Sequence, residues 1–498
     1  MSKPKAFLKQ SKSKKKADQA LDTADDFQAA GVDFEEAAGK WRAGDAVKSM
    51  RFFSRAIEVY DQGLQKFPSS LDLAYNRARV LLEISTHPLL VPHLTPQPLL
   101  EVLQQALQAH RYALALDQDN PDTLFNTAQV LTAIAEAFAK DPNHADTDAL
   151  QPLEEALELQ NRCLNIQELK LEESAEQQNE AARLESDFPV QPISEENNDR
   201  TEKSREDPAT AAMEDQWFSV VEPVTNDTLI DTILAQLATL TTICSVLGSS
   251  EASVSSPSLA WVEEYSSKLI HTKLPALLQD EDTERLQEVA LARANFMSEL
   301  LKAGYTQHSI DPETYKRERD EAFLVPELNL ENDFAALMAN ANSLVAFNAG
   351  FLEDDGSDAV SYAALRWGAL SAAIRNLAAA SKLSDPLPDD IAETHFLRGN
   401  CSLLQYQLGQ PPVSYGPAVA NSEQLTKNAD TFFRNANKLY QDDGQKRVAE
   451  FRSVVAQALH ADGDVTTTVV QYSQGWPEEL IKAQLDDMAD DGLISSAT

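Results

Sequence analysis

Apolar residues along the chain recur at three- and four-residue intervals, the spacing that places side chains on one face of an α-helix. Three segments with this pattern lie 50 residues apart: Arg55–Leu64, Gln105–Leu114 and Glu155–Leu164. Each has Ala followed by Ile or Leu, a small residue seven positions after the Ala, and then Leu. An internal period of this kind is typical of helical solenoids, so the pattern predicts repeated helices.

A second helix pattern alternates with the first. Ala74–Ile84 matches Leu124–Ile134 at the same offset, with Asn, Ala, Val, Leu and Ile in common. This alternation resembles the tetratricopeptide-repeat (TPR) family, whose helix-turn-helix units place small residues where two helix backbones approach closely. The residues that carry the resemblance in successive units are Gly44, Ala56, Tyr60, Gly63 and Pro68, then Ala78, Ala106 and Ala113, then Ala128, Ala156 and Cys163.

The resemblance implies an all-α fold, a TPR-like helix-turn-helix α-solenoid, although the repeat exceeds the family's usual length of about 34 residues. Gly44 and Ala56 lie 12 positions apart, whereas Ala78 and Ala106, the corresponding residues of the second unit, lie 28 apart, as do those of the third. We therefore expect insertions between the two helices of the second and third units. Such insertions can form a binding face on one edge of a solenoid, or they can be tolerated loop growth.

Helical patterns continue through the rest of the chain, between clusters of Gly, Ser and Pro residues. The later predicted helices are Thr225–Leu247, Ser258–Leu278, Glu284–Ala303, Glu331–Phe351, Asp358–Leu383, Asp390–Leu408, Ser422–Tyr440, Gln445–His460 and Pro477–Met488. The predicted organisation is a basic disordered tail (1–22), an N-terminal TPR array with inter-helix insertions (23–185), an acidic linker (186–215), a C-terminal TPR-like array (216–475) and an acidic C-terminal helix or tail (476–498).

The chain is strongly acidic, with a formal net charge of −37. Residues 1–16 carry seven lysines and no acid, whereas residues 172–215 carry 14 acidic and four basic side chains. An acidic surface repels nucleic acid and favours a basic protein partner, although the same charge can serve solubility alone. The lysines fit a nuclear-import signal or a disordered tail without a targeting signal. We therefore expect a cytoplasmic or nuclear protein, or one present in both compartments.

No membrane attachment is predicted. The N-terminus is polar and basic, unlike a signal peptide, and the most apolar run, Leu229–Leu247, contains Asp231, Gln236 and several threonines, which favours a buried helix. The spacing of the cysteines suits a reducing compartment and predicts small core residues at Cys163, Cys244 and Cys401.

The sequence contains no P-loop, dinucleotide fingerprint, HExxH or paired CxxC motif. Its eight histidines are scattered and form no metal-binding motif. His110 stands at the aromatic position of its helix pattern, which predicts a core residue. We therefore expect a protein that is not an enzyme, with no catalytic, cofactor-binding or metal-binding residues.

The TPR resemblance implies a concave groove lined by the first helix of each unit. An aromatic ladder along this groove can grip a peptide, and Asn side chains beside it can bind the peptide backbone. The same aromatic residues can instead pack between neighbouring helices. The predicted protein-binding residues are Trp41, Tyr75, Asn76, Arg79, Phe125 and Asn126.

Two functions fit these features. The first is an interaction scaffold or adaptor that binds a peptide or extended segment of a partner protein in the groove. The alternative is a dedicated assembly chaperone whose acidic surfaces cover a basic client, such as a ribosomal protein or a histone. Steep weakening of binding by salt is expected for the chaperone and not for an apolar groove.

The groove is not expected to bind the C-terminal peptide of Hsp70 or Hsp90. TPR proteins that do so hold the terminal carboxylate with Lys, Asn and Arg side chains at five fixed positions. Of the five corresponding positions here, only that of Asn76 holds the expected residue type. The other four positions hold Trp41, Asp45, Asp122 and Asn126, of which the two acids would repel a carboxylate. Calorimetric titration of a free EEVD-type peptide into residues 23–170 should show no binding, and micromolar affinity would overturn this expectation.

Overall fold

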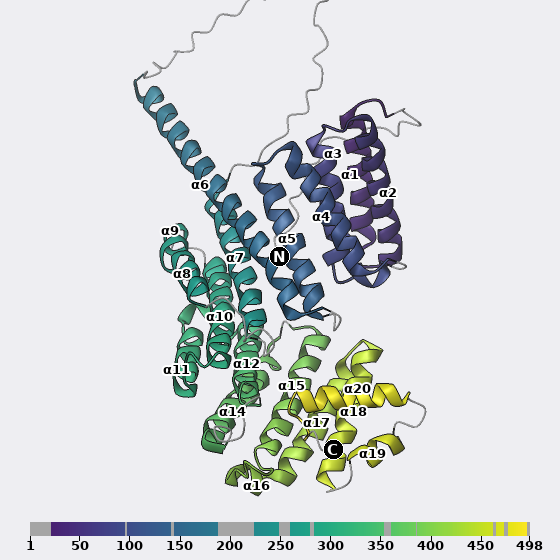
Figure 1. The fold of residues 1–498 in the computed structure, drawn as a ribbon, viewed down its shortest axis with the longest axis vertical. Helices are drawn as coiled ribbons and strands as arrows, with labels where there is room; N and C mark the ends of the chain where they lie inside the picture. Colours follow the sequence, from purple (N-terminus) through teal and green to yellow (C-terminus); the bar gives the residue numbers. More distant parts are fainter. Residues whose placement is uncertain are drawn as a thin grey trace, which may run out of the picture. The chain divides into compact units, whose positions relative to one another are not determined.

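The computed structural model describes residues 21–94, 97–140, 144–187, 224–248, 259–278, 283–352, 360–384, 386–461, 465–472 and 477–495. Every regular element within these ranges is a helix, which confirms the predicted all-α class (Figure 1). The predicted basic tail, except its last two residues, and residues 188–215 of the predicted acidic linker lie outside the described residues.

Contacts between helices divide the chain into two compact units. Unit 1 consists of residues 1–133 and 155–235, and unit 2 of residues 134–154 and 236–498. In unit 1, α1 packs on α2, α2 on α3, and α3 on α4, so helices that are neighbours in sequence are neighbours in space. The helices of the first half of the chain are α1 (Ala24–Trp41), α2 (Ala46–Lys66), α3 (Leu71–Thr86), α4 (Leu99–Leu116), α5 (Pro121–Lys140), α6 (Leu150–Asp187) and α7 (Asn226–Leu247).

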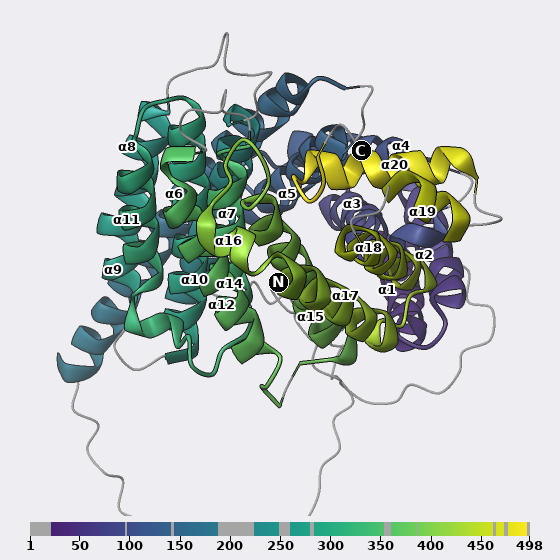
Figure 2. The same cartoon turned by 90° about the horizontal axis from the view of Figure 1, so that it is seen from below.

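Unit 2 repeats the same pairwise packing, with α10 on α11, α12 on α14, and α15 on α17 (Figure 2). Its helices are α8 (Ala260–Lys268), α9 (Leu274–Leu277), α10 (Thr283–Thr306), α11 (Pro312–Phe323), α12 (Phe334–Ala349), α14 (Ala363–Ala380), α15 (Pro388–Gln407), α16 (Gly416–Ala420), α17 (Ser422–Leu439), α18 (Asp443–His460), α19 (Val465–Tyr472) and α20 (Glu478–Asp490). The acidic helix α20 packs onto the core of this unit through Ile481 and Met488.

The predicted stripe of the second helices is buried. Its small residues have no exposed surface at Ala56, Ala106, Ala113, Ala156 and Cys163, and the same holds for Ala373, Ala380, Ala429 and Ala436 in unit 2. Small side chains let neighbouring helices approach closely, so the pattern that repeats in the sequence is the one that sets helix spacing.

A glycine of the first helix faces an aromatic ring of the second in two pairs. A Cβ atom added at Gly31 of α1 would overlap the buried ring of Tyr60 in α2, and one added at Gly399 of α15 would overlap the ring of Phe433 in α17. Each ring therefore packs directly against the backbone of the partner helix.

The predicted register of the first unit is wrong in its first helix. Gly44 lies in the turn between α1 and α2, where it is exposed, and Gly31 is the small residue that faces α2. Gly31 and Ala56 are 25 positions apart, close to the spacing in the later units. Because α1 and α2 have 18 and 21 residues, the long repeat comes from long helices in the first unit and not from an insertion there.

Two extra segments do separate the helices of the later pairs. The Pro-rich residues between α3 and α4 contain the short 3₁₀ turn Val91–His93, and α5 ends at Lys140, ten residues before α6 begins at Leu150. Helices α1, α3 and α5 begin at residues 24, 71 and 121, so the unit that repeats is a pair of helices 47 to 50 residues long.

Most predicted later helices are present within a few residues of their predicted ends. Helix α11 was not predicted, because its sequence PETYKRERDEAF is dominated by charge. Its buried face consists of Pro312, Tyr315, Arg319 and Phe323, so an arginine stands where a pattern search expects an apolar residue.

His110 is fully buried in α4, as predicted, and its Nδ1 lies 2.9 Å from the Ala106 carbonyl oxygen. Burial lowers the pKa of His110 to about 4, so the ring is neutral at pH 7. Among the described helices, only α7 is long and apolar enough to cross a membrane. Of its most apolar window, 61% is buried inside the protein, as is typical of a core helix.

We predict opposite effects for two glycine substitutions in α1. Gly31→Ala should lower the free energy of unfolding by about 1–3 kcal/mol, because the Tyr60 ring is buried and its hydroxyl is hydrogen-bonded to Glu35. Gly39→Ala should raise it by up to about 1 kcal/mol, because a Cβ there has no atom within 4 Å and Ala favours helix. Thermal unfolding followed by circular dichroism measures both changes, and equal effects would contradict this packing.

Candidate functional site

The first helices of three successive pairs are joined by side-chain contacts on one face. Arg79 of α3 forms an ion pair with Glu35 of α1, and Asn126 Nδ2 of α5 donates a hydrogen bond to Tyr75 Oη of α3 at 3.1 Å. Glu35 also accepts a hydrogen bond from Tyr60. We call the surface formed by α1, α3 and α5 around these residues the first-helix face.

The structure brings together three of the predicted site residues, Tyr75, Arg79 and Asn126. Asn76 and Phe125 are half-buried beside them in α3 and α5. Trp41 does not belong to this group. It ends α1, about 9 Å along the helix axis from Glu35, and Lys48 of α2 lies over its ring at 3.1 Å.

Glu35 is the residue of this face that sequence reasoning missed. It is one acid among many, and its partner Arg79 is 44 residues away. The two helices carry a second pair, Arg42 with Glu83, at a similar separation of 41 residues. Opposite charges at matching offsets in two helices of a repeat are the signal that would have revealed both pairs.

On this face, Tyr75 is neutral and Arg79 is charged. Burial, followed by the Asp122 carboxylate, raises the pKa of Tyr75 to about 12. For Arg79, burial lowers the pKa, but the Glu35 carboxylate outweighs burial and the net direction is upward. At pH 7 the Tyr75 hydroxyl therefore keeps its proton and can donate a hydrogen bond.

Helix α6 carries an exposed acidic segment. Past the end of the neighbouring helices of unit 1 it continues to Asp187 (Figure 1). Leu169 is 59% exposed on it. The exposed acids that follow, here called the acidic arm, are Glu172, Glu173, Glu176 and Glu180.

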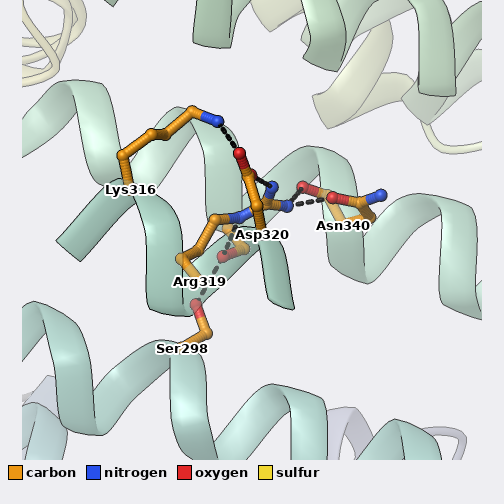
Figure 3. Close-up of polar contacts among 6 residues, drawn as sticks. Ser298, Lys316, Arg319, Asp320 and Asn340 are labelled. Atoms are coloured by element: carbon orange, nitrogen blue, oxygen red, sulfur yellow. Dashed lines mark hydrogen bonds and ion pairs between the residues drawn. The ribbon is translucent and has the colours of Figure 1, made fainter. Parts of the chain in front are cut away.

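Unit 2 contains a cleft that the sequence did not predict. It has a volume of about 490 Å³ and lies between α11, α12 and α14. On one side of it the buried Arg319 donates from Nε to Ser343 Oγ at 3.0 Å and from Nη2 to the Asn340 carbonyl oxygen at 2.7 Å. Figure 3 shows these contacts together with the ion pairs that Asp320 forms with Arg319 and Lys316.

Metal binding needs a group of ligating side chains, and thiol chemistry needs a deprotonated cysteine. No group of three or more His, Cys, Asp or Glu side chains among them is placed to hold a metal ion. Burial raises the pKa to about 12 for each of the thiols of Cys163, Cys244 and Cys401, so they are protonated at pH 7 and inert as nucleophiles.

Two curated yeast proteins are similar to parts of the chain, and no model of a known protein family matches it. UPF0656 protein C926.02 of Schizosaccharomyces pombe is 32% identical over 161 residues, which cover 31% of this chain and 35% of that protein. Uncharacterized protein YNL193W of Saccharomyces cerevisiae is 39% identical over 92 residues, which cover 17% of this chain and 16% of that protein. The chain thus aligns with about a third or less of the length of these relatives.

Among solved structures, a circular tandem repeat protein with novel repeat topology and enhanced subunit contact surfaces aligns over 94% of this chain and 96% of its own. The identity is 12% and the TM-score 0.28, which is too low to support an argument. The description of the fold as paired helical repeats therefore rests on the helices and their packing in this chain.

Proposed function

We propose that the chain is a non-catalytic, TPR-like interaction scaffold that binds an extended segment of a partner protein along the first-helix face of unit 1. The observation that carries the proposal is the pair of contacts that join α1, α3 and α5, Glu35 with Arg79 and Tyr75 with Asn126. These contacts hold three helices as one surface before a ligand arrives. Because these side chains are already ordered, binding loses less conformational entropy, which favours affinity.

The same residues keep hydrogen-bonding capacity for a ligand. In the described part of the chain, Tyr75 Oη accepts from Asn126 and still has its own proton to donate, and Asn126 keeps its carbonyl oxygen. Asn76 follows Tyr75 in α3 and is half-buried. An extended peptide backbone offers donors and acceptors in alternation, and Phe125 adds an aromatic surface for an apolar side chain.

A second function, assembly chaperone for a basic client such as a ribosomal protein or histone, is favoured by the acidic arm. Four exposed glutamates follow one another within nine residues of α6. A cationic client would be attracted to them over roughly a Debye length, about 8–10 Å at physiological salt. The client would also find the acidic surface of a chain with net charge −37. The cytoplasmic or nuclear location remains a prediction for either function.

We predict that capture of partners from the native cells separates the two functions. The tagged full chain, washed at about 0.05 M and at about 0.5 M salt, is compared with Phe125→Ala and with a variant in which the four arm glutamates are Gln. A scaffold partner should survive the high-salt wash and be reduced at least about tenfold by Phe125→Ala, because the aromatic contact is lost. A basic client should be lost at high salt and with the Gln variant. Quantitative mass spectrometry measures recovery.

Leu116→Ala is the matched control, because Leu116 is 37% exposed and lies on the second helix α4, away from the first-helix face. Its partners should be recovered as from the unmodified chain. Thermal unfolding of each variant confirms that the fold is retained. Recovery that neither Phe125→Ala nor the Gln variant changes would contradict both functions.

A further inference from the structure

The cleft between α11, α12 and α14 is open, apolar on its walls and independent of the first-helix face. Leu324, at the end of α11, is 75% exposed and lies on its rim. An exposed leucine beside other apolar side chains is typical of a surface that a partner covers. The further apolar lining comes from Phe323, Leu330, Leu344 and Leu365.

Part of the α14 wall of the cleft is made of small residues. Gly368 lies on it, and a Cβ added there would have no atom within 4 Å. Alanines line the helix on either side, at Ala364, Ala369 and Ala372. A ligand can therefore approach the α14 backbone closely, as small residues permit between helices.

The charge of the cleft is opposite to that of the chain. Its lining includes Lys316, Arg319 and Arg375 against the single acid Asp320, in a chain whose formal net charge is −37. Asp320 is paired with both Arg319 and Lys316, so its charge is compensated within the cleft. Arg375 is exposed and has no ion pair or hydrogen bond with the described residues. One cation therefore remains available to an incoming anion.

The polar network behind the cleft fixes its shape. Ser298 of α10 and Ser343 of α12 share a hydrogen bond of 2.6 Å, and Ser343 accepts from Arg319 of α11 (Figure 3). The buried Arg319, which is 3% exposed, thus joins α11 to α12, and the Ser298–Ser343 hydrogen bond joins α12 to α10. Because buried polar networks with satisfied partners are rigid, the cleft is formed before a ligand binds.

We propose that this cleft is a second binding site, which takes a short acidic segment of a partner protein that carries leucine or phenylalanine side chains. The apolar walls receive the hydrophobic side chains, and Arg375 attracts a carboxylate of the segment. Charge complementarity selects this partner against basic or nucleic-acid ligands. The site lies in unit 2 and does not rest on the scaffold function proposed for unit 1.

Gly368→Phe provides the sharpest test, because it places a ring on the cleft wall at a position where an added Cβ has no atom within 4 Å. Three pools of peptides, each peptide about ten residues long, are passed over the immobilised full chain. In the acidic pool, Asp or Glu alternates with Leu or Phe. In the Gln pool and the Lys pool, Gln or Lys replaces the acids. The acidic pool should be retained at least about tenfold more tightly than the Gln pool, and the Lys pool least. Gly368→Phe and Arg375→Glu should each weaken retention of the acidic pool at least about tenfold.

Two control variants change the same kinds of residue without occupying the cleft. Gly368→Ala adds a single methyl group, and Arg317→Glu reverses a charge on α11 that is paired with Glu318 and does not line the cleft. Both should retain the acidic pool within about twofold of the unmodified chain. Thermal unfolding shows whether each variant is folded, and Gly368→Phe should not lower the midpoint because it replaces a helical glycine.

Equal retention of the acidic and Gln pools would overturn the proposal, as would unchanged retention by Gly368→Phe. Tighter retention of the Lys pool would show that the acidic surface of the chain, and not the cleft, selects the ligand. Retention of the acidic pool does not depend on Phe125 or the acidic arm, so the cleft can fail this test while the functions proposed for unit 1 stand, and the reverse.

Discussion

The contact between a backbone and an aromatic ring inside a helix pair is the interaction on which the rest of this structure depends. Where Gly31 meets Tyr60 and Gly399 meets Phe433, the absence of a side chain lets a ring lie against the first helix. Close approach buries the small residues of the second helix, and burial of those residues makes each pair a unit that stacks on the next. The first-helix face includes α1, which this packing holds against α2.

The second helices could be predicted from the sequence because their packing demand is local and repeated. Ala and a second small residue seven positions later recur at intervals of 50 residues, and all of them are buried. The first helix of the first pair could not be placed in the same way. Its turn contains Gly44, which has the spacing expected in a shorter repeat, and only the three-dimensional contact distinguishes it from Gly31. Trp41 was assigned to the groove through that shifted register.

The two candidate sites differ in how much of each could be predicted from the sequence. Tyr75 and Asn126 stand at positions that recur with the helices, as Tyr75/Phe125 and Asn76/Asn126, whereas Arg79 corresponds to Gln129 in the next pair and is joined to Glu35 by an ion pair across 44 residues. The cleft of unit 2 depends on Arg319 at a buried position of a charged helix, and no periodic pattern marks it. The polar first-helix face thus follows the repeat pattern of this acidic chain. The cationic, apolar cleft of unit 2 depends on Arg319, which departs from that pattern.

A double-mutant cycle on Gly31 and Tyr60 tests the central claim most directly, with unfolding free energies measured for Gly31→Ala, Tyr60→Ala and the double variant. If the ring and the added methyl group compete for the same space, Gly31→Ala should lower the free energy of unfolding little or not at all in the Tyr60→Ala background. The coupling energy between the two substitutions should then be at least about 1 kcal/mol. Additive effects within about 0.5 kcal/mol would show that the two residues do not meet as described and would contradict the account of the helix pair.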